Sequence, residues 1–413
     1  MSERVIVVGC QLPDVPDHVY EESVAELEAL VTTAHGVVVG RLDQKRQAID
    51  RRTFIGKGKV EELVALADEL EPDLIIFNAE VTPGQMKNIR IALSDPEAIK
   101  LIDRTQLILD IFAGRAQSRE GKLQVELAQM SYLLPRLAGQ GTQLSRLGGG
   151  IGTRGPGESK LETDRRHIRR RVDEISKQLE TSVAHRARYR ERRKENQTFQ
   201  IALVGYTNAG KSTIFNRLTQ ADTYEKDELF ATLDPLTRQV DLPEGGQILL
   251  TDTVGFIQDL PTKLIAAFRS TLEEVLEADL ILHVVDASSE HYLNQMQTTN
   301  DVLDELGAGD IPQLEVYNKK DQLNRLFTGG KLLISALDPQ DIERLIEEIE
   351  RSISEILEYL EIRIPVDGFA HYNPAKEVMM NLKESFEEDG SVILKGYLRK
   401  DTRLYATLKQ YEV

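Results

Sequence analysis

The sequence predicts a multidomain α/β fold, and three observations carry this prediction. Its 413 residues are two to four times a typical domain of roughly 150 residues, so a single compact core is not expected. Short apolar, β-branched runs alternate with amphipathic helical patterns before residue 113 and again after residue 199, as in parallel sheets covered by helices. Charge and glycine content change abruptly between these two regions. We therefore expect domains over 1–113, 114–198, 199–358 and 359–413.

Composition excludes several protein classes. Apolar residues make up 41% of the chain and charged residues 29%, which argues against collagen, general disorder and a disulfide scaffold. Cys10 is the only cysteine, so neither an internal disulfide nor a cysteine-cluster metal site is expected. No run approaches the ~18 apolar residues of a membrane span, and the apolar run after Arg4 is too short for a signal peptide. We therefore expect a cytoplasmic protein with no membrane span.

The first hundred residues predict a parallel sheet with helices packed on it. Apolar residues such as Val24, Leu27, Leu30 and Val31 recur at three- and four-residue spacing, which is typical of an amphipathic helix. The expected strands are 4–9, 37–41, 73–77 and 99–102, and the expected helices are 20–34, 59–70 and 83–93.

The next segment predicts a basic helical hairpin. Helical patterns over 122–137 and 159–194 flank residues 139–157, which contain eight glycines and carry Arg146 and Arg154. The whole chain has a formal charge of -17, yet residues 114–195 hold 19 Lys and Arg against 10 Asp and Glu, a net of +9. A basic segment in an acidic protein suggests an element directed at a polyanion.

A second, doubly wound α/β unit is expected from Phe199 onward, followed by a small α+β domain. Its expected strands are 200–204, 247–252, 279–285, 313–318 and 331–335, and its expected helices are 211–218, 265–277, 294–306 and 341–357. In the tail we expect a strand at 361–366, a helix at 374–386, and strands at 391–398 and 403–411.

A phosphate-binding loop follows the first strand of this unit. The segment from Gly205 to Ser212 fits G-x-x-x-x-G-K-[ST] between a predicted strand and a predicted helix, which identifies a P-loop. Its backbone N–H groups can cradle phosphate oxygens, Lys211 can reach the β- and γ-phosphates, and the Ser212 hydroxyl can ligate Mg²⁺. The expected nucleotide contacts are Gly205, Tyr206, Thr207, Asn208, Ala209, Gly210, Lys211, Ser212 and Thr213.

Two further motifs, in the correct order, predict a GTPase domain. In D-x-x-G, Asp252 can hold a Mg²⁺-bound water and the Gly255 N–H can reach the γ-phosphate. In N-K-x-D, which comprises Asn318, Lys319 and Asp321, the Asp321 carboxylate can accept two hydrogen bonds from guanine that adenine does not offer. A backbone N–H of the segment Ser335, Ala336 and Leu337 can donate a hydrogen bond to guanine O6.

The segment between the P-loop and D-x-x-G should contain the first switch. A switch needs a threonine that reaches Mg²⁺ only when the γ-phosphate is present. Thr232 is the first candidate and Thr237 the second, and Phe230 is an expected nucleotide contact. We assign Mg²⁺ to Ser212, Thr232 and Asp252, and the catalytic roles to Lys211, Thr232 and Gly255.

Phe256 occupies the position where many GTPases place the glutamine that orients water. Because its side chain cannot hydrogen-bond water, hydrolysis should be slow unless a partner, the backbone or a metal ion positions the water. We expect alanine at this position to leave GTP binding nearly intact.

These segments resemble the HflX family of translational GTPases, in the Obg–HflX group. The resemblance rests on GYTNAGKST, FATLDP, DTVGFIQDLP and LHVVDAS in the nucleotide domain, and on FIGKGKVEEL, IDRTQLILDIFAGRA and GGGIGTRGPGESKLETDRR before it. It implies hydrolysis of GTP to GDP and phosphate, a hairpin directed at ribosomal RNA of the large (50S) subunit, and splitting or rescue of stalled ribosomes. Asn208 occupies the P-loop position at which relatives that lack the water-orienting glutamine can coordinate K⁺. We further expect a monomer.

Three alternatives remain open. The first is a ribosome biogenesis GTPase with the same chemistry, which would prefer immature subunits. The second is an RNA-remodelling protein with an additional N-terminal ATP site, because Gly56–Lys59 and the loop 148–157 contain glycines and cations, although neither fits a complete motif. The third, a small-molecule kinase, is disfavoured because it has no use for N-K-x-D.

Overall fold

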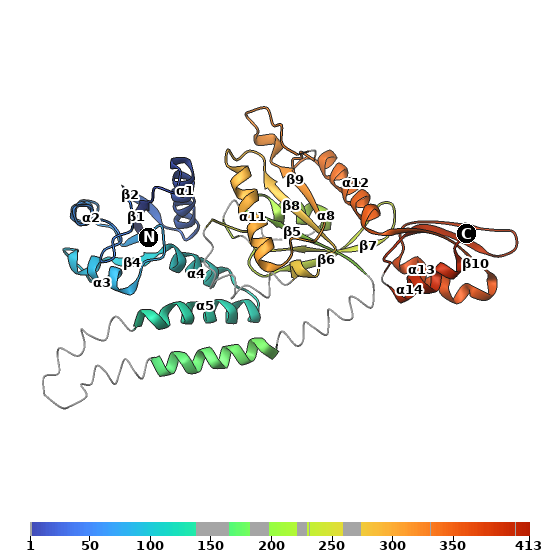
Figure 1. Cartoon of the computed structure of the whole chain (residues 1–413), viewed down its shortest axis with the longest axis horizontal. Helices are drawn as coiled ribbons and strands as arrows, with labels where there is room; N and C mark the ends of the chain where they lie inside the picture. The colour runs from blue at the N-terminus through green and yellow to red at the C-terminus, as the bar shows by residue number, and fades with distance from the viewer. Residues whose placement is uncertain are drawn as a thin grey trace. The chain divides into compact units, whose positions relative to one another are not determined.

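The computed structural model describes residues 2–137, 165–181, 198–220, 229–230, 232–258, 274–330, 332–400 and 402–413 (Figure 1). Contacts divide these residues into two compact units. The first contains 2–137 and 165–181 together with 229–230 and Gln258, and the second contains the remaining described residues. The predicted glycine-rich loop at 139–157 lies outside the described residues, as do both ends of the long helix predicted over 159–194.

The first unit is built on a parallel sheet, which confirms the predicted α/β architecture. The strand order is β2-β1-β3-β4, and all neighbouring strands run parallel. The strands are β1 (Arg4–Gln11), β2 (Val37–Lys45), β3 (Leu74–Phe77) and β4 (Lys100–Asp103). All four residues of β3 are buried, because a parallel sheet covered on both faces requires continuous apolar strands.

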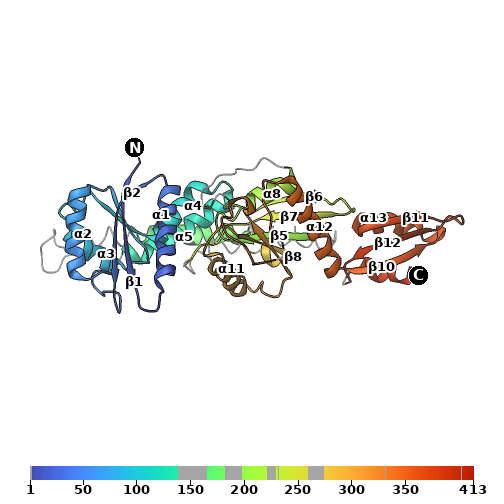
Figure 2. The ribbon, with the colours of Figure 1, turned by 90° about the horizontal axis from the view of Figure 1, so that it is seen from above.

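Four helices cover the two faces of this sheet. They are α1 (Asp17–Thr33), α2 (Lys57–Leu70), α3 (Pro83–Ala92) and α4 (Arg104–Arg115). Figure 2 shows α2 and α3 on one side of the strands and α1 and α4 on the other. Leu63 of α2 and Ile89 of α3 are completely buried against Ile6 and Ile75 of the sheet. The sequence analysis did not predict α4, which follows β4 without an intervening loop.

Two helices of the predicted hairpin belong to the first unit. The helix α5 (Arg119–Leu137) and the helix over 165–181 lie side by side (Figure 1). A bidentate pair joins them, because Arg171 donates to both carboxylate oxygens of Glu126 at 2.6 and 2.8 Å. Asp103, at the end of β4, accepts hydrogen bonds from Tyr132 and Arg136 of α5 at 2.6 and 3.0 Å. The hairpin is therefore bonded to the end of the sheet where α4 begins.

The second unit opens with a five-stranded sheet in the order β6-β7-β5-β8-β9. The strands are β5 (Phe199–Gly205), β6 (Leu236–Asp241), β7 (Gln247–Asp252), β8 (Leu280–Asp286) and β9 (Gln313–Asn318). The edge strand β6 is antiparallel and was not predicted. The strand expected at 331–335 is only a bridge between Leu333 and Tyr317 among the described residues.

Helices pack on both faces of this sheet, as expected for a doubly wound domain. Figure 2 shows α8 (Lys211–Thr219) and α12 (Pro339–Ile356) on one side of the strands and α11 (Tyr292–Leu306) on the other. Phe215 of α8 and Leu345 of α12 are fully buried in the main core of the unit. Most of the helix predicted over 265–277 lies outside the described residues.

The chain ends in a small α+β domain within the second unit, but two of its predicted elements are wrong. The antiparallel sheet is β10-β12-β11, formed by β10 (Glu358–Ile364), β11 (Met380–Phe386) and β12 (Val392–Leu398), with α13 (Tyr372–Val378) and α14 (Arg403–Leu408) beside it. The predicted helix at 374–386 ends at Val378, because residues 380–386 pair with β12 and this pairing overrides their helical propensity. The predicted strand at 403–411 is instead helical, with Thr402 capping α14. Short 3₁₀ segments are η2 (Lys320–Gln322), η3 (Val366–His371) and η4 (Lys409–Tyr411).

Candidate functional site

The loop between β5 and α8 has a backbone that requires glycine at both ends. Gly205 and Gly210 have φ values of 151° and 95°, which side chains with a Cβ rarely adopt. A Cβ on Gly205 would lie 2.1 Å from the carbonyl oxygen of Val284, and a Cβ on Gly210 would lie 2.1 Å from Nδ2 of Asn318. Asn208 also has a positive φ, of 61°, and is exposed. The loop therefore curls tightly over the end of β5 and leads into the N-terminus of α8.

Lys211 is a buried cation at the start of α8. Its Nζ donates to the carbonyl oxygens of Gly205 and Tyr206 at 3.0 and 2.8 Å. Burial lowers the pKa of Lys211 to about 8, and the nearby carboxylate of Asp252 opposes this shift. A cation desolvated in this way is stabilised by an anion placed beside it, so the loop suits a phosphate group.

Three oxygen-bearing side chains meet beside this loop. Ser212 Oγ and Thr232 Oγ1 lie 2.7 Å apart, and each donates to Oδ2 of Asp252, at 2.7 and 2.8 Å. The other carboxylate oxygen of Asp252 is buried and has no hydrogen-bond partner. Burial raises the pKa of Asp252, whereas Lys211, Ser212 and Thr232 lower it. An all-oxygen donor set with an unpaired buried carboxylate oxygen fits Mg²⁺.

Gly255 and Phe256 lie directly against the P-loop. A Cβ on Gly255 would be 2.8 Å from the backbone Cα of Thr207 and 2.9 Å from Nζ of Lys211, so only glycine allows this approach to the loop backbone. The backbone N–H of Phe256 donates to the carbonyl oxygen of Gly205 at 3.2 Å, and that of Thr207 donates to the carbonyl oxygen of Phe256 at 2.7 Å. The Phe256 ring is 0% exposed, so it belongs to the packing beneath the loop, which the motif did not reveal.

Because the Phe256 ring is buried, substitutions at this position should lower the stability of the fold. Phe256→Ala should lower the free energy of unfolding by about 3–5 kcal/mol, because it leaves a cavity where the ring packs. Phe256→Leu should lower it much less, because most of the apolar volume remains. Denaturant unfolding of the full chain measures both changes. An alanine variant as stable as the wild type would show that the ring does not support the loop.

Asn318 and Asp341 organise the segments at the far end of the loop. Asn318 donates from Nδ2 to the carbonyl oxygen of Ala209 at 2.9 Å and accepts the N–H of Ala336 at 3.0 Å. Asp341 accepts the N–H of Ser335 at 2.8 Å and pairs with Lys320. The N–H of Leu337 donates to Ser335 Oγ at 3.3 Å, so all three N–H groups expected to face guanine O6 are bonded to side chains.

Asp321 and Lys319 occupy the same region. Asp321 is exposed and accepts a hydrogen bond from the Ser335 hydroxyl at 2.6 Å, while Lys319 forms a 2.8 Å ion pair with Asp286. Asp286 and Asp341 were missed by the sequence analysis, because neither belongs to a contiguous motif and only the fold brings them to this loop.

The two candidate switch threonines lie in different environments. Thr232 reaches Asp252, whereas Thr237 belongs to β6 and its hydroxyl lies 2.9 Å from that of Thr251 on β7. The Phe230 side chain is 2% exposed and packs within the first unit. The structure thus brings Thr232, Ser212 and Asp252 together and places Thr237 in a strand pair.

Known protein families and individual relatives match this chain along its length. Residues 21–113 match a family described as GTP-binding GTPase N-terminal, 115–193 the GTP-binding GTPase Middle Region, and 200–319 the 50S ribosome-binding GTPase. GTPase HflX of Alkalihalophilus pseudofirmus is 53% identical over 413 residues, which cover 99% of this chain and 96% of that protein. The chain belongs to the HflX GTPase family. As an HflX family member it is an enzyme of the P-loop GTPase class that binds GTP and GDP.

A more distant relative agrees with this assignment. GTPase HflX of Escherichia coli is 39% identical over 382 residues, covering 90% of this chain and 89% of that protein. The crystal structure of SsGBP with GDP shares 25% identity, with a TM-score of 0.48 over 86% of this chain and 99% of that chain.

The second helix of the hairpin, over 165–181, presents its arginines to more than one side. Arg166, Arg169 and Arg170 are exposed, whereas Arg171 is turned toward Glu126. The three successive arginines therefore do not share one surface. Arg146 and Arg154 lie outside the described residues.

Gly56 and Lys59, which were considered for an ATP site in this HflX family member, make contacts within the first unit. Gly56 precedes α2, and its N–H donates to Oε1 of Gln44 at 2.8 Å. Lys59 is bonded to both carboxylate oxygens of Glu62 at 2.9 Å. The part of this candidate site that the structure describes is thus occupied by contacts within the domain.

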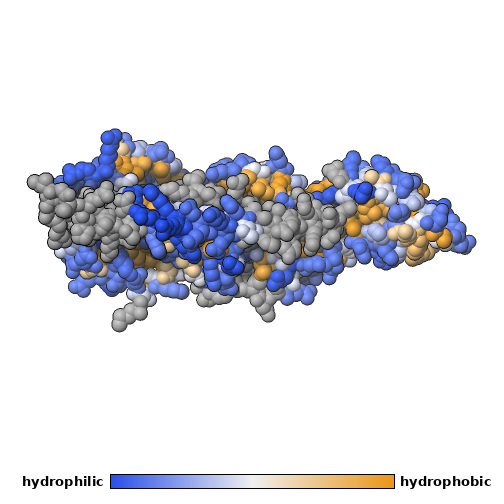
Figure 3. Space-filling model, turned by 90° about the horizontal axis from the view of Figure 1, so that it is seen from below, coloured by the Kyte–Doolittle hydropathy of each residue, from blue (hydrophilic) through white to orange (hydrophobic). Residues whose placement is uncertain are grey.

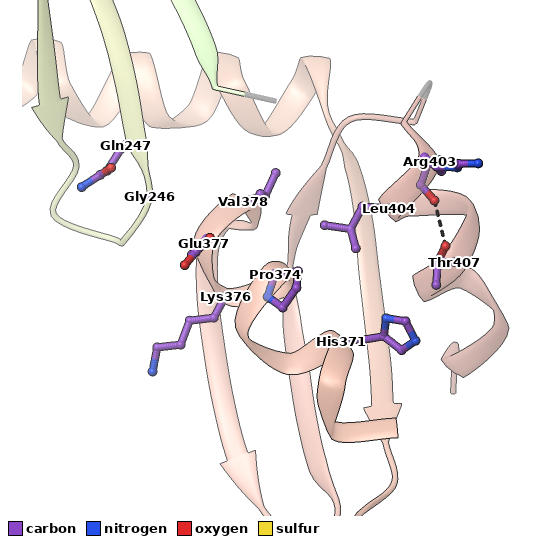
Figure 4. Close-up of a pocket in the computed structure, with 10 residues that line it drawn as sticks. All are labelled: Gly246, Gln247, His371, Pro374, Lys376, Glu377, Val378, Arg403, Leu404 and Thr407. Atoms are coloured by element: carbon purple, nitrogen blue, oxygen red, sulfur yellow. Dashed lines mark hydrogen bonds between the residues drawn. The ribbon is translucent and has the colours of Figure 1, made fainter. Parts of the chain in front are cut away.

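A separate hollow lies between the turn that joins β6 to β7 and the C-terminal helices. It has a volume of about 890 Å³. Figure 4 shows Pro374, Val378 and Leu404 within it, while Lys376 and Arg403 point away. Figure 3 shows hydrophobic residues gathered on the surface of the C-terminal domain. Gln247, His371 and Thr407 also line this hollow.

Two features are absent from the described ranges of this HflX family member. No helix among them is long and apolar enough to cross a bilayer. Within the same ranges, no three His, Cys, Asp or Glu side chains form a group that could hold a metal ion. The oxygen set around Asp252 differs from such a group because two of its three donors are hydroxyls.

Proposed function

We propose that this protein is a Mg²⁺-dependent GTPase that docks on the large ribosomal subunit and splits or rescues stalled ribosomes. The observation that carries the catalytic part is the meeting of Ser212, Thr232 and Asp252 beside the buried Lys211. The family description of residues 200–319 as a 50S ribosome-binding GTPase supports the choice of partner. We place the protein in the cytoplasm and expect it to act as a monomer.

The phosphate end of the site would hold the nucleotide as follows. Backbone N–H groups from Gly205 to Thr213 cradle the phosphates, and Lys211 exchanges its two carbonyl partners for phosphate oxygens. Ser212 and Thr232 would ligate Mg²⁺, and Asp252 would accept hydrogen bonds from its water ligands. When bound, the ion neutralises charge on the β- and γ-phosphates.

Hydrolysis requires a water in line with the bond between the γ-phosphorus and the β,γ-bridging oxygen. The water oxygen forms a bond to the γ-phosphorus while the bond from the γ-phosphorus to the bridging oxygen breaks, and the electron pair of the broken bond stays on GDP. One proton of the attacking water passes to a phosphate oxygen, so GDP and inorganic phosphate are the products. Lys211 stabilises the charge that develops on the oxygens, while the backbone of Thr232 and Gly255 can hold the water and the γ-phosphate. Because the Phe256 ring is buried, no side chain at position 256 orients the water, and basal turnover should be slow.

The base end of the site would select guanine. The exposed Asp321 carboxylate accepts two hydrogen bonds from guanine N1–H and its 2-amino group, with Asn318 and the segment 335–337 closing the pocket. Its Ser335 partner holds the carboxylate in place. We also propose Asn208, at the exposed turn of the P-loop, as a K⁺ ligand that supplies positive charge during hydrolysis.

The basic hairpin would provide the contact with ribosomal RNA. Residues 114–195 carry a net charge of +9 in a protein with a charge of -17, and Arg166, Arg169 and Arg170 are exposed. Arginine binds phosphate in a bidentate manner. A biogenesis factor with the same chemistry would bind immature subunits in preference to stalled ribosomes.

Shortening residues 139–157 to a tight turn tests this contact. The shortened variant should lose stimulation by large subunits and sedimentation with them, because the glycine-rich loop and its arginines are removed. Its GTP turnover in the absence of ribosomes should match that of the full chain, because the nucleotide site is untouched. Unchanged binding to the subunit would show that the loop is not the contact.

A further inference from the structure

Asp341 is a buried carboxylate that lies outside the three GTPase motifs. It belongs to the first turn of α12 and is 3% exposed. A buried carboxylate is costly unless it is paired and hydrogen-bonded. Neither phosphate binding nor the attack of water uses this group, so its role lies in the contacts that it makes.

The two oxygens of Asp341 bond to three other residues. Oδ2 accepts the N–H of Ser335 at 2.8 Å and a hydrogen bond from Nζ of Lys320 at 3.0 Å. Oδ1 accepts hydrogen bonds from Lys320 at 3.2 Å and from Arg344 at 3.0 Å. Ser335 begins the segment expected to face guanine O6, and Lys320 precedes Asp321 in N-K-x-D. One carboxylate therefore joins the two segments that would read the base.

A further bond connects this bridge to the carboxylate of Asp321. The Ser335 hydroxyl donates to Oδ1 of Asp321 at 2.6 Å, and Ser335 is itself buried. The backbone N–H of Lys320 also donates to the carbonyl oxygen of Ile334 at 3.0 Å. Ser335 is thus held at its N–H by Asp341 and holds Asp321 through its hydroxyl. The position of the Asp321 carboxylate therefore depends on Asp341.

The charge of Asp341 strengthens this hold. Burial would raise the pKa of Asp341, but the N–H of Ser335 and the cations Lys320 and Arg344 outweigh burial and leave the pKa below its usual value. Hydrogen bonds to an ionised acceptor are stronger than those between neutral groups. An amide at this position would keep an acceptor for Ser335 but would lose the attraction to both cations.

The backbone of N-K-x-D needs such a hold. Lys319 has a φ of 64°, a left-handed conformation that is uncommon for a residue with a side chain and persists where surrounding contacts impose it. The Lys319 side chain pairs with Asp286 at 2.8 Å, and the next residue, Lys320, is bound by Asp341. Ion pairs on both sides therefore support the bend that leads from β9 to Asp321.

We propose that Asp341 is a positioning residue that sets the selectivity of the pocket for guanine. This inference rests on the proposed role of Asp321 in reading the base. Asp341 acts through Ser335 and Lys320, which it holds so that Asp321 presents both carboxylate oxygens in one fixed orientation. Hydrogen bonds weaken steeply when they are misaligned. When the hold is lost, the bond from the guanine 2-amino group to Asp321 weakens, whereas the phosphate end of the site is unaffected.

Asp341→Asn in the full chain tests this role with a pair of diphosphates. The base of inosine diphosphate (IDP) has the N1–H and the 6-oxygen of guanine but lacks the 2-amino group. The ratio of affinities for GDP and IDP therefore measures how well Asp321 meets that amino group, and the contribution of the phosphates cancels. Calorimetry with Mg²⁺ should give a ratio about three- to tenfold smaller than in the wild type, because part of one charge-assisted hydrogen bond is lost.

Asp338→Asn is the matched control. Asp338 is the N-cap of the same helix and accepts the N–H of Gln340 at 3.0 Å, and asparagine caps a helix about as well as aspartate. Its ratio should equal that of the wild type. An unchanged ratio in Asp341→Asn, or an equal fall in both variants, would overturn the proposal. A loss of affinity that is the same for GDP and IDP would also overturn it, because a merely structural role lowers both alike.

Lys320→Met reaches the same bridge from its other end. Methionine keeps much of the apolar stem and removes the ammonium group that binds Asp341. The Lys320 side chain is 45% exposed, so this variant should fold even if Asp341→Asn does not. Its ratio should also fall, and the double variant should lose no more of the ratio than the stronger single variant. Additive losses would show that the two residues act separately.

The wild-type chain separates this inference from the proposed function. A wild type that prefers GDP to IDP, together with variants that keep this preference in full, would refute the inference alone. A wild type that binds both diphosphates equally would refute the proposed reading of guanine by Asp321, and the inference with it.

Discussion

Asp252→Asn should reduce the rate of GTP turnover by a factor on the order of 10²–10³. The side-chain oxygen of asparagine can still accept hydrogen bonds from Ser212 and Thr232, so the local fold should be retained. Asparagine lacks the negative charge that balances Lys211 and Mg²⁺, and it replaces the unpaired buried oxygen with either an amide donor or a weaker acceptor. Turnover at saturating GTP and Mg²⁺ measures the effect.

Asp241→Asn is the matched control for this variant. The same change from a carboxylate to an amide is made at Asp241, on the neighbouring strand β6. The Asp241 side chain is exposed and is bonded to Gln247. Turnover by this variant should equal that of the wild type. If Asp252→Asn kept more than about a tenth of wild-type turnover while remaining folded, Asp252 would not act at the metal position.

Asp321→Asn should change the base that the site accepts. Two charge-assisted hydrogen bonds to guanine are lost, which predicts a fall in GTP affinity on the order of 10²–10⁴. Xanthine carries a carbonyl in place of the 2-amino group, and the asparagine amide can donate to that carbonyl. The variant should therefore bind xanthosine triphosphate more tightly than GTP, the reverse of the wild type.

Calorimetry with both nucleotides, on both proteins, measures this exchange. Because the xanthine nucleotide should restore binding, the test separates a change of specificity from simple damage to the pocket. A variant that keeps wild-type affinity for GTP would show that Asp321 does not read the base. A variant that binds neither nucleotide would show that its main role is to hold Ser335, to which it is bonded.

Much of the fold could be predicted because its two larger sheets are mainly parallel. Their central strands are buried on two faces, so segments such as residues 74–77 appear as continuous apolar runs with helices between them. Helix α4 was missed because Asp103 ends β4 and also caps the helix, which leaves no loop as a signal. The tail was misassigned because the pairing of β11 with β12 is a long-range interaction that local propensity does not contain.

The same distinction between local and long-range features separates the parts of the candidate site that could be predicted from those that could not. The P-loop, D-x-x-G and N-K-x-D are contiguous segments, so the sequence alone predicts their order and their chemistry. Asp341 holds Ser335 and Lys320, and Asp286 pairs with Lys319, but these contacts exist only once the sheet has assembled. The burial of Phe256 and Phe230 could not be predicted from a motif either. The Phe230 ring, for example, packs against Phe112, which lies far away in the sequence.

The most direct test of the proposed function is GTP turnover by the full chain with and without purified large ribosomal subunits, in potassium buffer and in sodium buffer. Slow turnover by the free protein, a rise of at least about tenfold on addition of subunits, and a higher rate in potassium are the predicted result. A tenfold rise corresponds to about 1.4 kcal/mol of additional transition-state stabilisation. Turnover that does not respond to large subunits in either buffer would contradict the account of a GTPase that acts on the ribosome.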